Sequence, residues 1–97
     1  MKKFSGNEIQ THLSENLKNW TFEDNAIRRD FKFRNFIDAF SFMTEVALHA
    51  EKMDHHPDWS NVYNSVVIKL STHSEGGVTE NDYELAAIAD RAYGKFA

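Results

Sequence analysis

Apolar residues near the start of the chain recur at a helical spacing. The apolar positions are Ile9, Leu13 and Leu17, each four residues after the last. Just before them, Ser5 and Glu8 have the Ser-x-x-Glu spacing of a capping box, in which each residue satisfies a free backbone N–H group of the other. The pattern predicts a short first helix over roughly residues 6–17.

The spacing then changes to an alternation of apolar and polar residues, which is typical of strands with one buried side. The alternation runs through Trp20, Phe22, Ile27, Arg29, Phe31 and Phe33. Asp24 and Asn25 interrupt it, and both residue types favour turns. We therefore expect a β-hairpin that turns at these two residues.

A broad apolar stripe at helical spacing comes next, after Asn35, which is a favourable N-cap residue. The stripe contains Phe36, Ile37, Phe40, Met43, Val46, Ala47 and Ala50. It predicts the longest helix of the chain, ending near Met53, with this stripe against the core. Phe42 and Leu48 lie partly outside the stripe, so they are either subunit contacts or ordinary exposed apolar residues.

Two runs rich in β-branched and aromatic residues, 61–63 and 66–70, predict a second hairpin. Only Asn64 and Ser65 lie between the runs, which leaves room for no more than a tight turn. Alternate residues of a strand face opposite sides. One side of the last strand is then Val66, Ile68 and Leu70, and the other, more polar side is Val67, Lys69, Ser71 and His73.

The glycines at 76–77 end this strand, and Thr79-x-x-Asp82 then caps a last helix. Its predicted buried stripe is Leu85, Ile88, Ala89, Ala92 and Phe96. The element order is thus α-β-β-α-β-β-α. We expect a single α+β domain over residues 1–97, with a four-stranded antiparallel sheet and three helices on one face.

Composition narrows the classes of function. The chain has 15 acidic and 11 basic residues and a formal charge of −4, so it lacks the basic surface expected for binding nucleic acid or an anionic membrane. It contains no cysteine, which excludes disulfides and thiolate chemistry. No signal-peptide pattern or membrane-length apolar run is present, so we expect a cytoplasmic protein. A chain of 97 residues has a small core and often gains stability by oligomerisation.

Three histidines offer the clearest chemistry. His55 and His56 precede Pro57, where the long helix must end, and His73 follows the last strand. Histidine accepts and donates protons near neutrality, so three of them together would make an acid/base site. Rings on adjacent extended residues point in different directions, which suits one for catalysis and one for holding a ligand. Each histidine alone is better explained as a surface or turn residue. His12 and His49 belong to no motif, and we expect both to be exposed.

These segments together resemble the pterin-4a-carbinolamine dehydratase family. The resemblance rests on residues 42–48, 51–59, 61–64 and 70–73 and on the Thr79-x-x-Asp82 helix start, and it spans most of the chain. The run Glu-x-x-x-His-His-Pro-x-Trp with a later Thr-His is its most specific part. Asn19, where the family often has glycine, and Ser60, where an aromatic residue is common, are departures that affect turn geometry and subunit contacts more than the histidines.

The resemblance implies a dehydratase that converts 4a-hydroxytetrahydrobiopterin, a 4a-carbinolamine, to quinonoid dihydropterin and water. This reaction recycles the cofactor of aromatic amino acid hydroxylases, which would be the functional partner. It implies no metal and no bound cofactor, a small pterin as substrate, and a homodimer or homotetramer. Some family members also act as dimerisation partners of a transcription factor, so a non-enzymatic coactivator module is the alternative function.

The predicted site follows from the motifs and the resemblance. The catalytic residues are His55, His56 and His73. We assign proton transfer to His55 and His73, which come from separate elements, and binding of the pterin to His56. The expected substrate contacts come from Asp54, His55, His56, Ser71, Thr72, His73 and Ser74, with backbone groups of Ser71 and Thr72 on the pyrimidine edge.

Four further residues have a supporting role in one interpretation and a structural role in the other. They are Glu51, Pro57, Trp59 and Asp82. Glu51 lies one turn before His55, so it either orients or charges that ring or is only solvated. Asp82 is well explained as a helix cap, and a supporting role in the site is the alternative. Trp59 is expected to be half core and half pocket wall. A metal site would need three converging ligands, for which only these histidines and nearby carboxylates are candidates.

Overall fold

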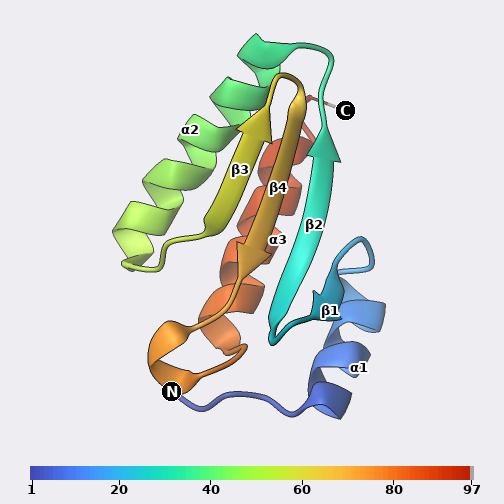
Figure 1. Ribbon diagram of the computed structural model, residues 1–97, viewed down its shortest axis with the longest axis vertical. Helices are drawn as coiled ribbons and strands as arrows, with labels where there is room; N and C mark the ends of the chain where they lie inside the picture. The colour runs from blue at the N-terminus through green and yellow to red at the C-terminus, as the bar shows by residue number, and fades with distance from the viewer. Residues whose placement is uncertain (97) are drawn as a thin grey trace.

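The computed structural model describes residues 1–96, and its elements follow the predicted order (Figure 1). The predicted α+β class, with three helices and a four-stranded antiparallel sheet, is confirmed. The elements are α1 (Gly6–Asn16), β1 (Thr21–Glu23), β2 (Ala26–Lys32), α2 (Phe36–Met53), β3 (Asp58–Val62), β4 (Ser65–Leu70), the short 3₁₀ helix η1 (His73–Glu75) and α3 (Glu80–Tyr93).

The helix starts have the caps that the sequence indicates. The Glu8 N–H group donates to Ser5 Oγ at 3.2 Å, and the Ser5 N–H group donates to Glu8 Oε1 at 2.7 Å, which completes the capping box of α1. The hydrogen bond from the Ser5 N–H group to the carboxylate lowers the pKa of Glu8. Asn35 caps α2 by accepting from the Asp38 N–H group at 2.8 Å.

The sheet separates a buried side from an open side. Its strand order is β1-β2-β4-β3, and β2 and β4 pair with Ile27 opposite Leu70 and Phe31 opposite Val66. These four side chains are buried against the helices, and in Figure 1 α3 passes behind β4 and β2. The predicted buried side of β4 is confirmed. The other side of the sheet carries mostly polar and charged side chains.

The two hairpin turns differ in how well the sequence predicts them. Asp24 and Asn25 form the first turn, and both have the left-handed backbone that Asp and Asn tolerate, with φ of 51° and 64°. The second turn is at Tyr63 and Asn64, one residue earlier than predicted, because Ser65 already pairs with Lys32 and Val62 in the sheet. Tyr63 takes the left-handed conformation there, with φ of 51°.

The buried side of α2 differs from the predicted stripe. Its buried residues are Ala39, Phe42, Val46 and Ala50, and Phe42 packs on Phe31 and Phe33 with ring centres 4.8 Å and 5.0 Å away. The predicted stripe is therefore wrong in part, because α2 packs against α3 as well as the sheet, which turns Phe42 into the core. Exposed apolar side chains remain along α2, namely Phe36 (47% exposed), Ile37 (72%), Phe40 (56%) and Leu48 (69%).

Helix α3 buries most of its predicted stripe. Leu85, Ala89 and Ala92 are buried as predicted, while Ile88 and Phe96 are partly buried, and Phe96 lies beyond the end of the helix. Tyr83 and Ala86 complete the buried side.

One histidine outside the motifs is also packed rather than exposed. The His12 ring of α1 stacks on Tyr83 of α3 with centres 3.8 Å apart, so the expectation of an exposed His12 is wrong, whereas His49 is exposed. The helical spacing missed this contact because it predicts which residues share a side of one helix, and not which neighbouring helix covers them. Burial raises the pKa of the Tyr83 hydroxyl.

Within residues 1–96, no helix is both long enough and apolar enough to cross a membrane.

Candidate active site

The two histidines that follow α2, His55 and His56, lie in different surroundings. Asp54 follows the helix in a left-handed conformation, with φ of 54° and ψ of 42°, and the His55 N–H group donates to Ala50 O at 3.0 Å. His55 then lies inside the protein with 8% of its surface exposed, while His56 is exposed. The prediction that adjacent rings point in different directions is confirmed.

His55 pairs with a buried carboxylate. Its Nε2 atom lies 2.5 Å from Asp82 Oδ1, and Asp82 is fully buried at the start of α3. Asp82 Oδ2 accepts from the Thr72 hydroxyl at 2.9 Å and from the Thr79 N–H group at 2.8 Å. Asp82 therefore caps α3 and also holds His55. The same carboxylate thus has both the structural role and the supporting role that the sequence allowed.

His56 pairs with a carboxylate at the surface. Its Nε2 atom lies 2.8 Å from Glu51 Oε1 on the last turns of α2, and the side chains are 59% and 81% exposed. Exposed pairs of this kind contribute little to stability because both groups are well solvated. Glu51 thus contacts His56 and not His55, and the His56 ring remains accessible to a ligand.

His73 opens the short η1 helix and is exposed. Its loop is closed by the Thr72 N–H group, which donates to Gly77 O at 2.7 Å, and Gly76 supplies the left-handed conformation that the loop needs, with φ of 70°. The Asn25 side-chain amide donates to Gly76 O at 2.5 Å and ties this loop to the first hairpin turn.

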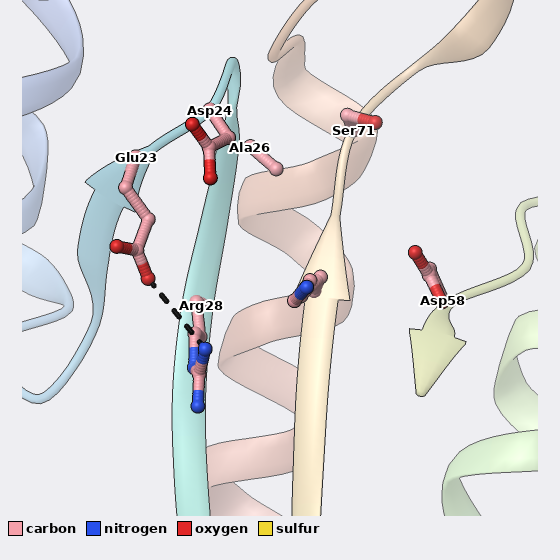
Figure 2. A pocket seen from close by; sticks show the side chains of 7 residues that line it. Glu23, Asp24, Ala26, Arg28, Asp58 and Ser71 are labelled. Carbon is pink, nitrogen blue, oxygen red and sulfur yellow. Dashed lines mark ion pairs between the residues drawn. The ribbon is translucent and has the colours of Figure 1, made fainter. Parts of the chain in front are cut away.

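A hollow lies on the open side of the sheet near these segments. It has a volume of about 270 Å³ and is lined by Glu23, Asp24, Ala26, Arg28, Asp58, Lys69 and Ser71. Figure 2 shows Arg28 directed toward Glu23, with Asp58 and Ser71 across the sheet from them. Arg28 also pairs with Asp30 at 2.8 Å, and this hydrogen bond raises the pKa of Arg28 and lowers the pKa of Asp30.

A second hollow of about 260 Å³ adjoins the first and shares Asp24 and Ser71 with it. It is lined in addition by Asn25, Thr72, His73, Gly76 and Gly77. The two hollows together extend from Asp58, two residues after His56, to the loop that carries His73. The structure therefore brings Ser71, Thr72 and His73 to one concave surface, whereas His55 and His56 line neither hollow.

The remaining predicted site residues have clear positions. Asp54 is exposed at the end of α2, Ser74 is exposed in η1, and Pro57 is partly buried just before β3. Trp59 pairs with the buried Ile68 across the β3–β4 ladder and packs against the core. Its side chain is thus on the helix side of the sheet, opposite the hollow that Asp58 lines.

Sequence reasoning missed two residues that hold the site. Thr79 was predicted only as a cap, although its backbone also positions the carboxylate that binds His55. Asn25 was predicted only as a turn residue, and nothing in the local pattern indicates its bond to Gly76, which is 51 positions away. Among residues 1–96, no three histidine or acidic side chains are grouped so that they could hold a metal ion.

Comparison with known proteins shows that the fold is that of a pterin dehydratase domain. The sequence profile of the family described as pterin 4 alpha carbinolamine dehydratase matches residues 2–92. The chain belongs to this family.

Individual relatives agree with the family profile. The chain is 48% identical over 85 residues to a protein of Prochlorococcus marinus (strain NATL2A), with 88% of both chains covered. It is 50% identical over 95 residues to a protein of Mesorhizobium japonicum, with 96% of both covered. Each relative is provisionally named a pterin-4-alpha-carbinolamine dehydratase.

A solved structure shows the same fold. The crystal structure described as a transcriptional coactivator/pterin dehydratase from Brucella melitensis superimposes with a TM-score of 0.92 and 44% sequence identity. The comparison covers 96% of this chain and all of that one.

We predict that Asn25 restrains the loop that carries His73. Replacing Asn25 by glycine keeps the left-handed turn but removes the donor to Gly76 O. Hydrogen exchange at Gly76 and Gly77 should become faster, with a loss of global stability of about 1 kcal/mol. Asp24→Gly is the matched control, because it makes the same change in the same turn and leaves the Asn25 bond in place. Equal exchange in both variants would contradict the prediction.

Proposed function

We propose that the protein dehydrates 4a-hydroxytetrahydropterins to quinonoid dihydropterins by histidine acid/base catalysis, in the recycling of a tetrahydropterin used by an aromatic amino acid hydroxylase. Membership of the dehydratase family supports this reaction. The observation that carries the mechanism is the buried pair of His55 and Asp82. The exposed His56 follows His55 in the sequence, and Thr72 links Asp82 to the loop that carries His73.

The reaction needs two proton transfers. One proton goes to the departing 4a-hydroxyl group, which leaves as water, and another leaves the neighbouring ring nitrogen as the carbon–nitrogen double bond forms. An acid and a base must therefore act on the substrate together. We assign these roles to His55 and His73, which lie on separate elements.

The contacts of His55 suit proton transfer. A carboxylate that binds one ring nitrogen fixes the orientation and the tautomer of the imidazole, as in other acid/base sites. Asp82 occupies Nε2 of His55, so we assign proton transfer with the substrate to Nδ1. His73 lines the concave surface together with Ser71 and Thr72, whose backbone groups are suited to hydrogen-bond the pyrimidine edge of a pterin.

His56 has a different environment and a different proposed role. Its partner Glu51 is exposed, so their weak pairing leaves the ring free to rotate toward a ligand. Asp54 and Ser74, both exposed on the segments that carry the histidines, are proposed as further pterin contacts. Pro57 joins His56 to β3, and Trp59 packs from β3 against the core, so both are proposed to support the site by fixing this part of the chain.

The activity is tested directly with a 4a-hydroxytetrahydropterin generated chemically or by a hydroxylase. We expect the protein to accelerate water loss over the spontaneous reaction, and we expect the rate to be unchanged by a chelator. Stopped-flow absorbance measurements follow the formation of quinonoid dihydropterin with and without chelator. No acceleration would overturn the proposed function, and loss of the rate on chelation would overturn the metal-free mechanism.

Alanine variants test the division of roles. General acid/base catalysis contributes roughly a hundred- to ten-thousand-fold, so His55→Ala and His73→Ala should mainly lower kcat by factors in that range. His56→Ala should mainly raise KM. His49→Ala, an exposed histidine elsewhere on α2, is the control and should change neither constant. A His56 variant that loses kcat at unchanged KM would show that the roles are wrongly assigned.

We also propose that the chain forms a homodimer or homotetramer through α2. Four apolar side chains on this helix are 47–72% exposed, and a chain of this size has a small core, so burial against a second copy would stabilise it. Phe40→Lys should shift the molar mass measured by light scattering toward that of one chain. His49→Lys, on another side of the same helix, should not. A wild-type protein that is monomeric at micromolar concentration would contradict this proposal.

The same exposed side chains favour one alternative function, that of an interaction module for a transcription factor. The Brucella melitensis structure is described as a coactivator as well as a dehydratase. An interaction module has no need for the histidines. A protein that binds such a partner but does not accelerate dehydration would favour this alternative.

A further inference from the structure

A chain of buried hydroxyl groups continues from Asp82 away from His55. The Thr72 hydroxyl donates to Asp82 Oδ2 at 2.9 Å and lies 2.6 Å from the Thr79 hydroxyl. Thr79 and Asp82 are fully buried, and Thr72 is 9% exposed. Polar groups at such depth need defined partners, because each unpaired one would carry a desolvation cost.

The direction of each hydrogen bond in this chain follows from the donors present. A hydroxyl has one proton, and Thr72 uses it for Asp82, so Thr79 must donate to Thr72. Asp82 Oδ2 also accepts from the Thr79 N–H group. Oδ2 thus accepts from two donors, and a proton on Nε2 of His55 would make Oδ1 an acceptor in the same way.

Thr72 also belongs to the loop that carries His73. Its N–H group donates to Gly77 O at 2.7 Å, and its carbonyl accepts from the Glu75 N–H group at 3.0 Å. The next residue in the chain is His73. Thr72 therefore binds Asp82, the partner of His55, through its side chain. Through its backbone it binds the loop that carries His73.

We propose that the Thr72 hydroxyl is a positioning group that couples the tautomer of His55 to the placement of His73. This proposal rests on the function proposed above and adds to it the residue that links the two histidines. The hydroxyl orients Asp82, Asp82 keeps the proton of His55 on Nε2, and Nδ1 stays unprotonated. The role belongs to the Thr72 side chain and is separate from any contact of its backbone with a pterin.

The test compares Thr72→Val, which has nearly the same shape but no hydroxyl, with Thr72→Ser, which keeps the hydroxyl. The valine variant leaves Asp82 Oδ2 with one donor and the Thr79 hydroxyl without its acceptor. Nitrogen-15 NMR of the histidine rings in the ligand-free protein should show the Nε2–H tautomer of His55 in the wild type and the serine variant. It should show a mixture of tautomers in the valine variant.

Kinetics supply the second measurement. We expect Thr72→Val to lower kcat about tenfold with little change in KM, and Thr72→Ser to restore it. Thr21→Val is the matched control, because it removes an exposed hydroxyl from β1 and should leave both the tautomer and kcat unchanged. Denaturant unfolding of each variant shows that it is folded, and Thr72→Ala takes the place of Thr72→Val if the valine variant does not fold.

The outcomes separate this proposal from the proposed function. A valine variant with the wild-type tautomer and wild-type kcat would overturn the coupling while the dehydratase stands. Lower stability with an unchanged tautomer would show that Thr72 only supports the fold. A wild-type protein without dehydratase activity would overturn the proposed function, and the proposed effect on catalysis with it, even if the tautomers differ.

Discussion

The carboxylate of Asp82 imposes the strictest physical constraint on this structure. It has no exposed surface, and a buried ionised group without partners would cost several kcal/mol. Its donors come from the end of α2, the end of β4 and the residue before α3, so these three segments must meet at one point. The relative positions of these three segments are therefore fixed by the hydrogen bonds that the Asp82 carboxylate needs.

The local patterns predicted the fold well. Helix caps, strand alternation and turn residues depend on neighbours within a few positions, and these indicated every α-helix and strand in the right order, but not the short 3₁₀ helix η1. They were less reliable where two packing partners compete. The buried side of α2 includes Phe42 because α3 and the sheet both pack on this helix, and a stripe counted along one helix cannot show which neighbour covers it.

The candidate site was predicted in its residue types but not in its contacts. The motif and the resemblance indicated three histidines, yet local spacing suggested that Glu51 would serve His55, whereas it pairs with His56. The partner of His55 is 27 positions away, and the Asn25 bond to Gly76 spans 51. Such pairings depend on how the hairpins and helices assemble, and no local pattern in a single sequence contains that information.

Asp54 shows how a single backbone conformation determines which substitutions a site accepts. Its left-handed geometry turns the chain at the end of α2, so that the next ring goes inward and the one after it stays at the surface. Glycine, asparagine and aspartate adopt this geometry at low cost, while β-branched residues do so only with strain. Over evolution, position 54 should therefore vary within a narrow set of residues even though its side chain is exposed. A valine or isoleucine at this position in a related chain would indicate a different helix end and a different arrangement of the two histidines.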